Sequence, residues 1–243
     1  MAQNIVIYQD EGVGEFGVSC LLQFFKDDHV RLADAAAITD GGVFEDTHVF
    51  VMPGGADLPY CRKLNGKGNA NIRSFVENGG TYLGICAGAY YGCSALEFHK
   101  GRTDEISGTR ELAFVDAVAY GSLPEIAPYY DQTLKSAGLT KLDINGKNVH
   151  FFYHGGPAFR IEGKDINVVA RYAELKQNPP AIIKTGVGSG HVFLLGIHPE
   201  MTAQNMAGWP AEDNEKEILK NIITRMSESN TNTYSILRDL LRV

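Results

Sequence analysis

The chain has 243 residues, of which 44% are hydrophobic and 21% are charged, and its formal net charge is −7 at pH 7. This ordinary globular composition gives enough apolar surface for one large α/β core. The acidic balance, without any run of Lys or Arg, argues against nucleic acid or an acidic membrane as the main partner. The four cysteines stand at spacings that fit neither a CxxC redox pair nor a zinc site, so we expect no metal and no cofactor.

The first residues contain neither a basic segment nor a long apolar one. The sequence therefore predicts neither a signal peptide nor a membrane span. Reduced cysteines and a cytoplasmic location are the matching expectations.

The first half of the chain alternates short apolar runs with helical patterns. Apolar, β-branched runs predict strands at residues 4–8, 29–36, 49–52 and 81–85. Helical spacing and C-cap chemistry predict helices at 14–26 and 72–77, and small residues predict another helix after 85. This alternation predicts an α/β fold with a doubly wound, mainly parallel sheet covered on both faces.

The second half has a different pattern. Residues 112–120 and 148–153, with Gly- and Pro-rich connections, predict additional antiparallel strands or hairpins in or beside the sheet. Residues 182–184 and 191–197 flank a glycine-rich segment and predict a hairpin, and helices are predicted at about 212–228 and 234–241. No composition break marks a domain boundary, so we expect a single domain over residues 1–243.

Cys86 stands at the turn between the predicted strand at 81–85 and the helix that follows. In an open α/β sheet, this turn projects a side chain into the crevice at the carboxyl ends of the strands. Gly84 and Gly88 permit the tight backbone that a nucleophile on such a turn needs. The helix N-terminus favours a thiolate, and the N–H of Ala87 is free to face a developing oxyanion. The competing interpretation is a buried structural cysteine among packing glycines.

A thiolate nucleophile needs a base, and the base needs an acceptor that orients it. His198 follows the predicted strand at 191–197, and Glu200 is close enough in sequence to hold the imidazole in one tautomer. A His-x-Glu segment alone is common and says little about function. It supports a catalytic role only together with the Cys86 turn. Together the three residues predict a catalytic triad.

These motifs resemble those of the class I glutamine amidotransferases. Residues 84–88 resemble the nucleophile turn of that family, residues 196–200 resemble its His-x-Glu segment, and the order Cys, His, Glu matches. Residues 52–55 look like its oxyanion loop. The resemblance implies the flavodoxin-like sheet of that family, with the N–H groups of Gly55 and Ala87 stabilising the oxyanion.

A narrower resemblance covers nearly the whole chain. Residues 53–60, 84–92, 110–114 and 153–156 are similar to blocks of the N-terminal domain of eukaryotic-type biotin–protein ligases and its free-standing bacterial relatives. This resemblance implies an unknown small-molecule ligand and a protein partner related to biotin metabolism. The Gly/Arg-rich loop of the ligase catalytic domain has no match here, so biotin transfer by this chain alone is not expected.

Tyr90 marks a departure from the glutaminase pattern. It stands four residues after Cys86, where glutamine amidotransferases usually have a Gln that helps to bind substrate. Other candidates for a pocket that selects a small polar ligand, each also explicable as a packing or surface residue, are Asp10, Glu11, Asp57, Tyr60, Tyr90, Tyr153 and His154. Arg110 and Arg160 are able to bind a carboxylate, but the sequence does not place them.

The favoured hypothesis is an amidotransferase-like enzyme in which Cys86 attacks a small amide or ester and transfers or hydrolyses its acyl group. The alternative is a non-catalytic or regulatory module that keeps the pocket for a small molecule or a partner. A third, weaker hypothesis is glyoxalase-like or protease-like cysteine chemistry involving Glu11, as in neighbouring branches of the superfamily.

Overall fold

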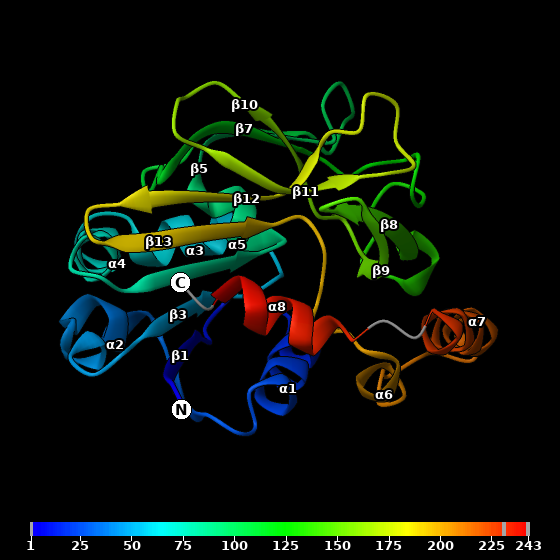
Figure 1. Ribbon diagram of the computed structural model, residues 1–243, viewed down its shortest axis with the longest axis horizontal. Helices are drawn as coiled ribbons and strands as arrows, with labels where there is room; N and C mark the ends of the chain where they lie inside the picture. The colour runs from blue at the N-terminus through cyan, green and yellow to red at the C-terminus, as the bar shows by residue number, and fades with distance from the viewer. Residues whose placement is uncertain (1, 230–231, 242–243) are drawn as a thin grey trace.

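A computed structural model describes residues 2–229 and 232–241. Its central sheet has the strand order β2-β1-β3-β4-β13-β12-β11-β8-β9 (Figure 1). The first five strands pair in parallel: β2 (His29–Ala33), β1 (Asn4–Tyr8), β3 (Val49–Met52), β4 (Thr81–Ile85) and β13 (Gly190–Leu195). With β13 in fifth place, this is the strand order of the flavodoxin-like doubly wound fold. The predicted mainly parallel sheet is confirmed.

The sheet is extended by antiparallel strands at one side. These are β12 (Pro180–Val187), β11 (Asn167–Tyr172), β8 (Gly138–Ile144) and β9 (Lys147–Tyr153). The predicted hairpin of residues 182–184 and 191–197 is confirmed as β12–β13, with Ile182 opposite Leu195 and Val187 opposite Gly190.

Helices cover both faces of the parallel strands (Figure 1). Along β1, Ile5 and Ile7 belong to the cluster of α1 (Glu15–Phe24) and α8 (Thr233–Leu241). Val6 and Tyr8 belong to the opposite cluster, which includes α2 (Ala35–Asp40), α3 (Asp57–Leu64), α4 (Lys67–Glu77) and α5 (Ala87–Gly92). Side chains alternate between the faces of a strand, so burial on both faces explains the uninterrupted apolar runs.

A second, smaller sheet lies over α5. It has the order β10-β7-β5-β6, from β10 (Ala158–Ile161), β7 (Val115–Gly121), β5 (Cys93–Phe98) and β6 (Ile106–Thr109). Leu96, Ala119 and Phe159 share a core with Tyr90 and Tyr91. Because β7 pairs in parallel with β5, the expectation of antiparallel strands at 112–120 is wrong on that side. β5 begins at Cys93, directly after the short helix α5.

Further differences concern the helices and their boundaries. The strand expected at 29–36 ends at Ala33, because the Asp34 side chain accepts a hydrogen bond from Ala37 N and caps α2. Neither α3 nor α6 (Ala203–Met206) was predicted, and α7 (Lys216–Glu228) begins later than residue 212. Two short 3₁₀ turns lie at Gly42–Phe44 and Leu134–Ser136. Within residues 2–229 and 232–241, every helix is too short or too polar to cross a membrane.

Candidate active site

The carboxyl ends of three neighbouring parallel strands bring the predicted catalytic segments together. Met52 of β3 is paired with Gly84 of β4, and Ile85 of β4 is paired with Leu195 of β13. The loop after β3, the turn after β4 and the segment after β13 therefore leave the sheet at one edge. These are the segments that carry Gly55, Cys86 and His198.

Cys86 occupies a strained turn. Its φ of 51° and ψ of −105° lie outside the usual regions for a residue with a side chain, at a cost of about 1–3 kcal/mol. The turn packs directly on β3, since a Cβ added to Gly88 would stand 2.0 Å from the Met52 carbonyl oxygen. The Cys86 Sγ is 3.5 Å from the carbonyl oxygen of His154, to which the thiol donates a weak hydrogen bond. Because α5 has only six residues, we assign no role to its dipole.

His198 is held by Glu200. Its Nδ1 lies 2.8 Å from Glu200 Oε1, and both side chains are buried. A carboxylate only accepts hydrogen bonds, so Nδ1 carries the hydrogen. The other nitrogen, Nε2, has no hydrogen-bond partner within the described part of the chain.

Cys86 and His198 flank the same small residue, Gly54. A Cβ added to Gly54 would stand 2.8 Å from His198 Cε1 and 3.4 Å from Cys86 Cβ. The imidazole and the thiol-bearing carbon are therefore neighbours across a gap that glycine leaves open. In this resting arrangement the thiol points to the His154 carbonyl, so it must turn toward Nε2 before a proton passes between them.

Opposing effects set the charge of His198. Burial alone would lower its pKa, but the negative charge of Glu200, the hydrogen bond to Glu200 and the nearby Cys86 raise the pKa well above the ordinary 6.5. We therefore expect an imidazolium near neutral pH. Its positive charge stabilises a thiolate beside it.

The two predicted oxyanion donors are unengaged. Ala56 N donates to Gly12 O and Gly88 N donates to Pro53 O, which fixes the loop and the turn on either side of the site. The N–H groups of Gly55 and Ala87 make no hydrogen bond to another described residue. Both donors remain available to a ligand.

Cys86 opens into a cavity of about 450 Å³. Of the predicted pocket residues, Asp57, Tyr90 and His154 line it. Tyr90 donates its hydroxyl hydrogen to Gly155 O at 3.1 Å, so this hydroxyl ties α5 to the loop after β9. With its hydroxyl engaged in this way, Tyr90 lines the cavity beside Cys86.

The other predicted pocket residues lie outside this cavity lining. Tyr60 bonds to the carbonyl oxygens of Pro53 and Gly54 and so supports the oxyanion loop from behind. Tyr153 accepts from Leu123 N and donates to Gly156 O. Asp10 bonds to Ala35 N, and Glu11 pairs with Arg62 at 2.6 Å on the surface.

Several lining residues were not anticipated from the sequence. Phe98, His99 and Asp104 come from the end of β5 and the loop after it, and Tyr130 and Asp131 come from the loop before Leu134–Ser136. These loops show no periodic pattern in the sequence. The two adjacent tyrosines at 129–130 were the one sequence feature that could have indicated a contribution to the cavity. Arg110, named from the sequence but not placed by it, pairs with Asp57 at 2.6 Å, whereas Arg160 pairs with Glu97 and Glu162 on the surface.

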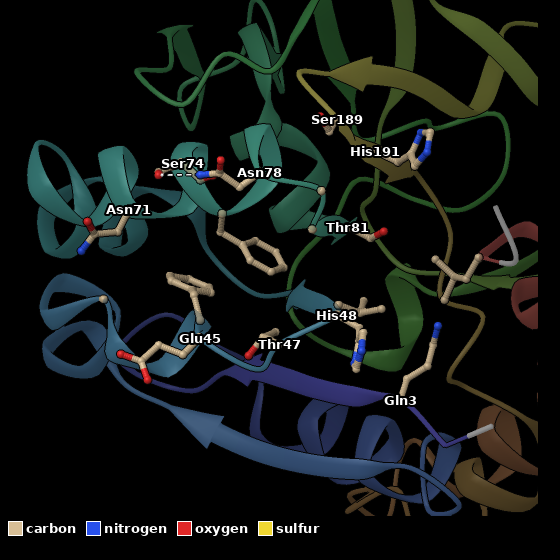
Figure 2. A pocket seen from close by; sticks show the side chains of 17 residues that line it. Gln3, Glu45, Thr47, His48, Asn71, Ser74, Asn78, Thr81, Ser189 and His191 are labelled. Atoms are coloured by element: carbon tan, nitrogen blue, oxygen red, sulfur yellow. Dashed lines mark hydrogen bonds between the residues drawn. The ribbon is translucent and has the colours of Figure 1, made fainter.

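A larger cavity, of about 700 Å³, lies at the opposite edge of the sheet (Figure 2). Its lining includes Thr81 and His191, which stand at the start of β4 and β13. It is therefore at the amino ends of the strands whose carboxyl ends carry Cys86 and His198. Parallel α/β sheets place their reactive sites at the carboxyl ends, so the Cys86 cavity is the candidate. Among the described residues, no group of three or more His, Cys, Asp or Glu side chains is arranged to hold a metal ion.

The sequence of residues 3–243 matches the profile of a family described as the N-terminal region of biotin–protein ligase. The chain belongs to the biotin–protein ligase N-terminal family. It is 33% identical over 209 residues to an uncharacterised protein from Chlamydia muridarum, covering 82% of this chain and 80% of that protein. It is 32% identical over 232 residues to a biotin–protein ligase from Schizosaccharomyces pombe. That match covers 88% of this chain but only 35% of the ligase.

Solved structures show the same fold outside the family. A glutamine amidotransferase from Thermotoga maritima superposes with a TM-score of 0.62 at 13% identity, covering 99% of this chain and 97% of that one. At this identity, the similarity establishes the class I glutamine amidotransferase-like fold and not the activity.

Proposed function

We propose that the protein is a cysteine-dependent enzyme that hydrolyses a small amide or ester, or transfers its acyl group. The observation that carries this proposal is the position of His198. Its Nδ1 is bound to Glu200, its ring lies beside Cys86 across Gly54, and no described residue forms a hydrogen bond to Nε2. These positions support roles as nucleophile, base and orienting acid in acyl transfer.

The proposed reaction has two stages. Cys86 Sγ attacks the carbonyl carbon and forms a C–S bond, while the N–H groups of Gly55 and Ala87 bind the oxyanion. Collapse of this intermediate breaks the bond to the leaving amine or alcohol, which takes a proton from the His198 imidazolium. In the second stage, neutral His198 removes a proton from water, or from an acceptor nucleophile, which attacks the acyl group and releases the Cys86 thiolate.

Glutamine is not the proposed substrate. Tyr90 stands at the sequence position where glutamine amidotransferases usually have a Gln, and its hydroxyl is already bonded to Gly155 O. The relationship to a biotin–protein ligase suggests a protein partner in biotin metabolism, as an extension of the proposal.

One observation favours a second candidate, a binding or regulatory module that keeps the cavity without chemistry. In the structure, the Cys86 thiol donates to the His154 carbonyl and not to His198. If the thiol stays there, it is a structural donor and the cavity serves binding alone.

Competitive alkylation of the four cysteines separates these candidates. Burial, followed by the charge of Glu200, raises the pKa of Cys20 to about 12, and burial raises those of Cys61 and Cys93. These three thiols are therefore poor nucleophiles near neutral pH. With limiting iodoacetamide at pH 7.5, we expect Cys86 to be labelled at least about tenfold faster than Cys61, as quantified by peptide mass spectrometry.

Cys61 is the internal reference because its side chain is more exposed than that of Cys86. Faster labelling of Cys86 therefore reports a more reactive thiol and not a more accessible one. Labelling of Cys86 at or below the rate of Cys61 would favour the binding module. The rate for Cys61 should be the same in the Cys86→Ala variant, which confirms that the two thiols react independently.

A further inference from the structure

Asp57 presents one carboxylate oxygen to the Cys86 cavity. Its Oδ2 accepts from Arg110 Nε at 2.6 Å, and Arg110 Nη1 donates to Thr109 O at 2.9 Å. Asp57 and Arg110 are each only 8% exposed, so the carboxylate is fixed in one orientation. The other oxygen, Oδ1, receives no hydrogen bond from another described residue. Asp57 lines the cavity, so a ligand in the cavity is able to supply that hydrogen bond.

This free oxygen is an incomplete acceptor. The Arg110 guanidinium, paired with Asp57 Oδ2, compensates the negative charge of the carboxylate. The Asp57 side chain is largely buried but lines the cavity, so a ligand N–H that reaches Oδ1 there gains a charge-assisted hydrogen bond. The site is thus built to gain from a donor.

His154 supplies a second acceptor on the cavity lining. Its Nε2 is 3.1 Å from the Thr133 carbonyl oxygen, which only accepts, so Nε2 carries the hydrogen. Burial lowers the pKa of His154 to about 4, with the nearby His198 contributing, so the ring is neutral near pH 7. Its Nδ1 then carries a lone pair and has no partner within the described residues.

The lining offers no free cation for an anionic ligand. Arg62 is the single Lys or Arg among the described residues that line the cavity, and it is paired with Glu11 at 2.6 Å. The other Asp, Glu, Lys or Arg side chains of the lining are the acidic Asp57, Asp104 and Asp131. The aromatic rings of Tyr90, Phe98 and Tyr130 form apolar walls beside them.

We infer, on the basis of the proposed acyl transfer, that the substrate is an amide or ester with a flat apolar body and an uncharged N–H donor that binds Asp57. Asp57 is then a specificity determinant, and Arg110 is the residue that positions it. A substrate with a carboxylate in that place is disfavoured, because its negative charge meets that of Asp57, and Arg110, which is paired with Asp57, does not line the cavity.

Three matched electrophiles test this inference. Each has a chloroacetamide that alkylates a thiol, with the C–S bond forming as chloride leaves with the C–Cl electron pair. A benzyl group links it to a primary carboxamide, an N,N-dimethylcarboxamide or a carboxylate in the para position. The second-order rate constant for Cys86 is measured by mass spectrometry and divided by that of N-acetylcysteine, which removes differences in intrinsic reactivity.

In the unmodified protein, we expect the primary carboxamide to react about tenfold faster than either other probe, the value of one charge-assisted hydrogen bond. The dimethylamide is uncharged like the carboxamide but has no N–H at the para position. Comparing these two probes therefore separates the effect of hydrogen-bond donation from that of charge in the unmodified protein. Asp57→Asn should bring all three normalised rates within about twofold, because the amide replaces the anionic acceptor. The same substitution at the exposed Asp46, Asp46→Asn, should keep the tenfold preference.

The outcomes separate this inference from the proposed function. Fast labelling of Cys86 without preference among the probes would overturn the role of Asp57 and leave the nucleophile intact. A preference that persists in Asp57→Asn would also overturn it. Labelling no faster than N-acetylcysteine but with the preference intact would refute the enzyme and support the specificity. Where labelling is too slow to measure, dissociation constants of the acetamide analogues, from calorimetry, give the same comparison.

Discussion

Replacing Cys86 with alanine is expected to lower kcat/KM for the hydrolysis of 4-nitrophenyl acetate by about 10⁴-fold or more, as loss of a nucleophile does in other acyl-transfer enzymes. The substitution removes the atom that forms the acyl bond, while the Gly55 and Ala87 donors and the cavity remain. The rate is followed by nitrophenolate release under second-order conditions.

The control is Cys61→Ala, which removes a thiol from α3, outside the cavity lining. It should retain the original kcat/KM within about twofold, the range expected for a site without a catalytic contact. Circular dichroism of both variants verifies the fold. A Cys86→Ala variant that hydrolyses the ester at the original rate would remove Cys86 from the mechanism.

Replacing Glu200 with glutamine is expected to lower kcat by about 10²–10⁴-fold, as in other triads that lose the orienting acid. The amide is close in size to the carboxylate and still accepts from His198 Nδ1, so the geometry changes little. What it removes is the negative charge, which is the largest influence that raises the pKa of His198 against its burial. The imidazolium is therefore less stable in the variant.

The same substitution should shift the pH–rate profile in a definite direction. The pKa of His198 is raised in the folded protein, so the imidazolium persists to a pH well above 6.5. It is lost only as the pH rises through the raised pKa. Without Glu200, the alkaline limb of the kcat/KM profile should move to lower pH. The measurement is a pH–rate profile of both proteins with the same ester.

Glu111→Gln serves as the matched control, since Glu111 is exposed and bonds to Gly66 N and Asn69 outside the cavity. It should leave the profile unchanged. If Glu200→Gln lowered kcat with no shift in the alkaline limb, the acid would act only by holding the imidazole in place.

The parallel strands of the fold could be predicted from the sequence for a physical reason. Strands buried on both faces must be apolar at every position, and runs such as 4–8, 49–52 and 81–85 show this directly. The predicted nucleophile and base could be chosen because both follow such strands, and neighbouring parallel strands end at one edge. The local pattern therefore predicted which residues meet, although it gave no order for the strands.

The rest of the site was less accessible because it depends on distant pairings. Asp57 and Arg110 are 53 residues apart, and nothing near either residue indicates the other. The small sheet over α5 pairs β7 in parallel with β5, which a hairpin pattern does not predict. Tyr60 and Tyr153 were chosen as pocket residues for their chemistry, but their hydroxyls bond to backbone groups behind the site.

The most direct test of the account is to trap the acyl group on Cys86. The protein is mixed with 4-nitrophenyl acetate, quenched in acid within the first turnover, digested and analysed by mass spectrometry. The account predicts a burst of nitrophenolate that approaches one equivalent and an acetyl group on the peptide that contains Cys86. Nitrophenolate release without a burst, with acetylation of other residues and an unmodified Cys86, would contradict the central claim that Cys86 is the nucleophile.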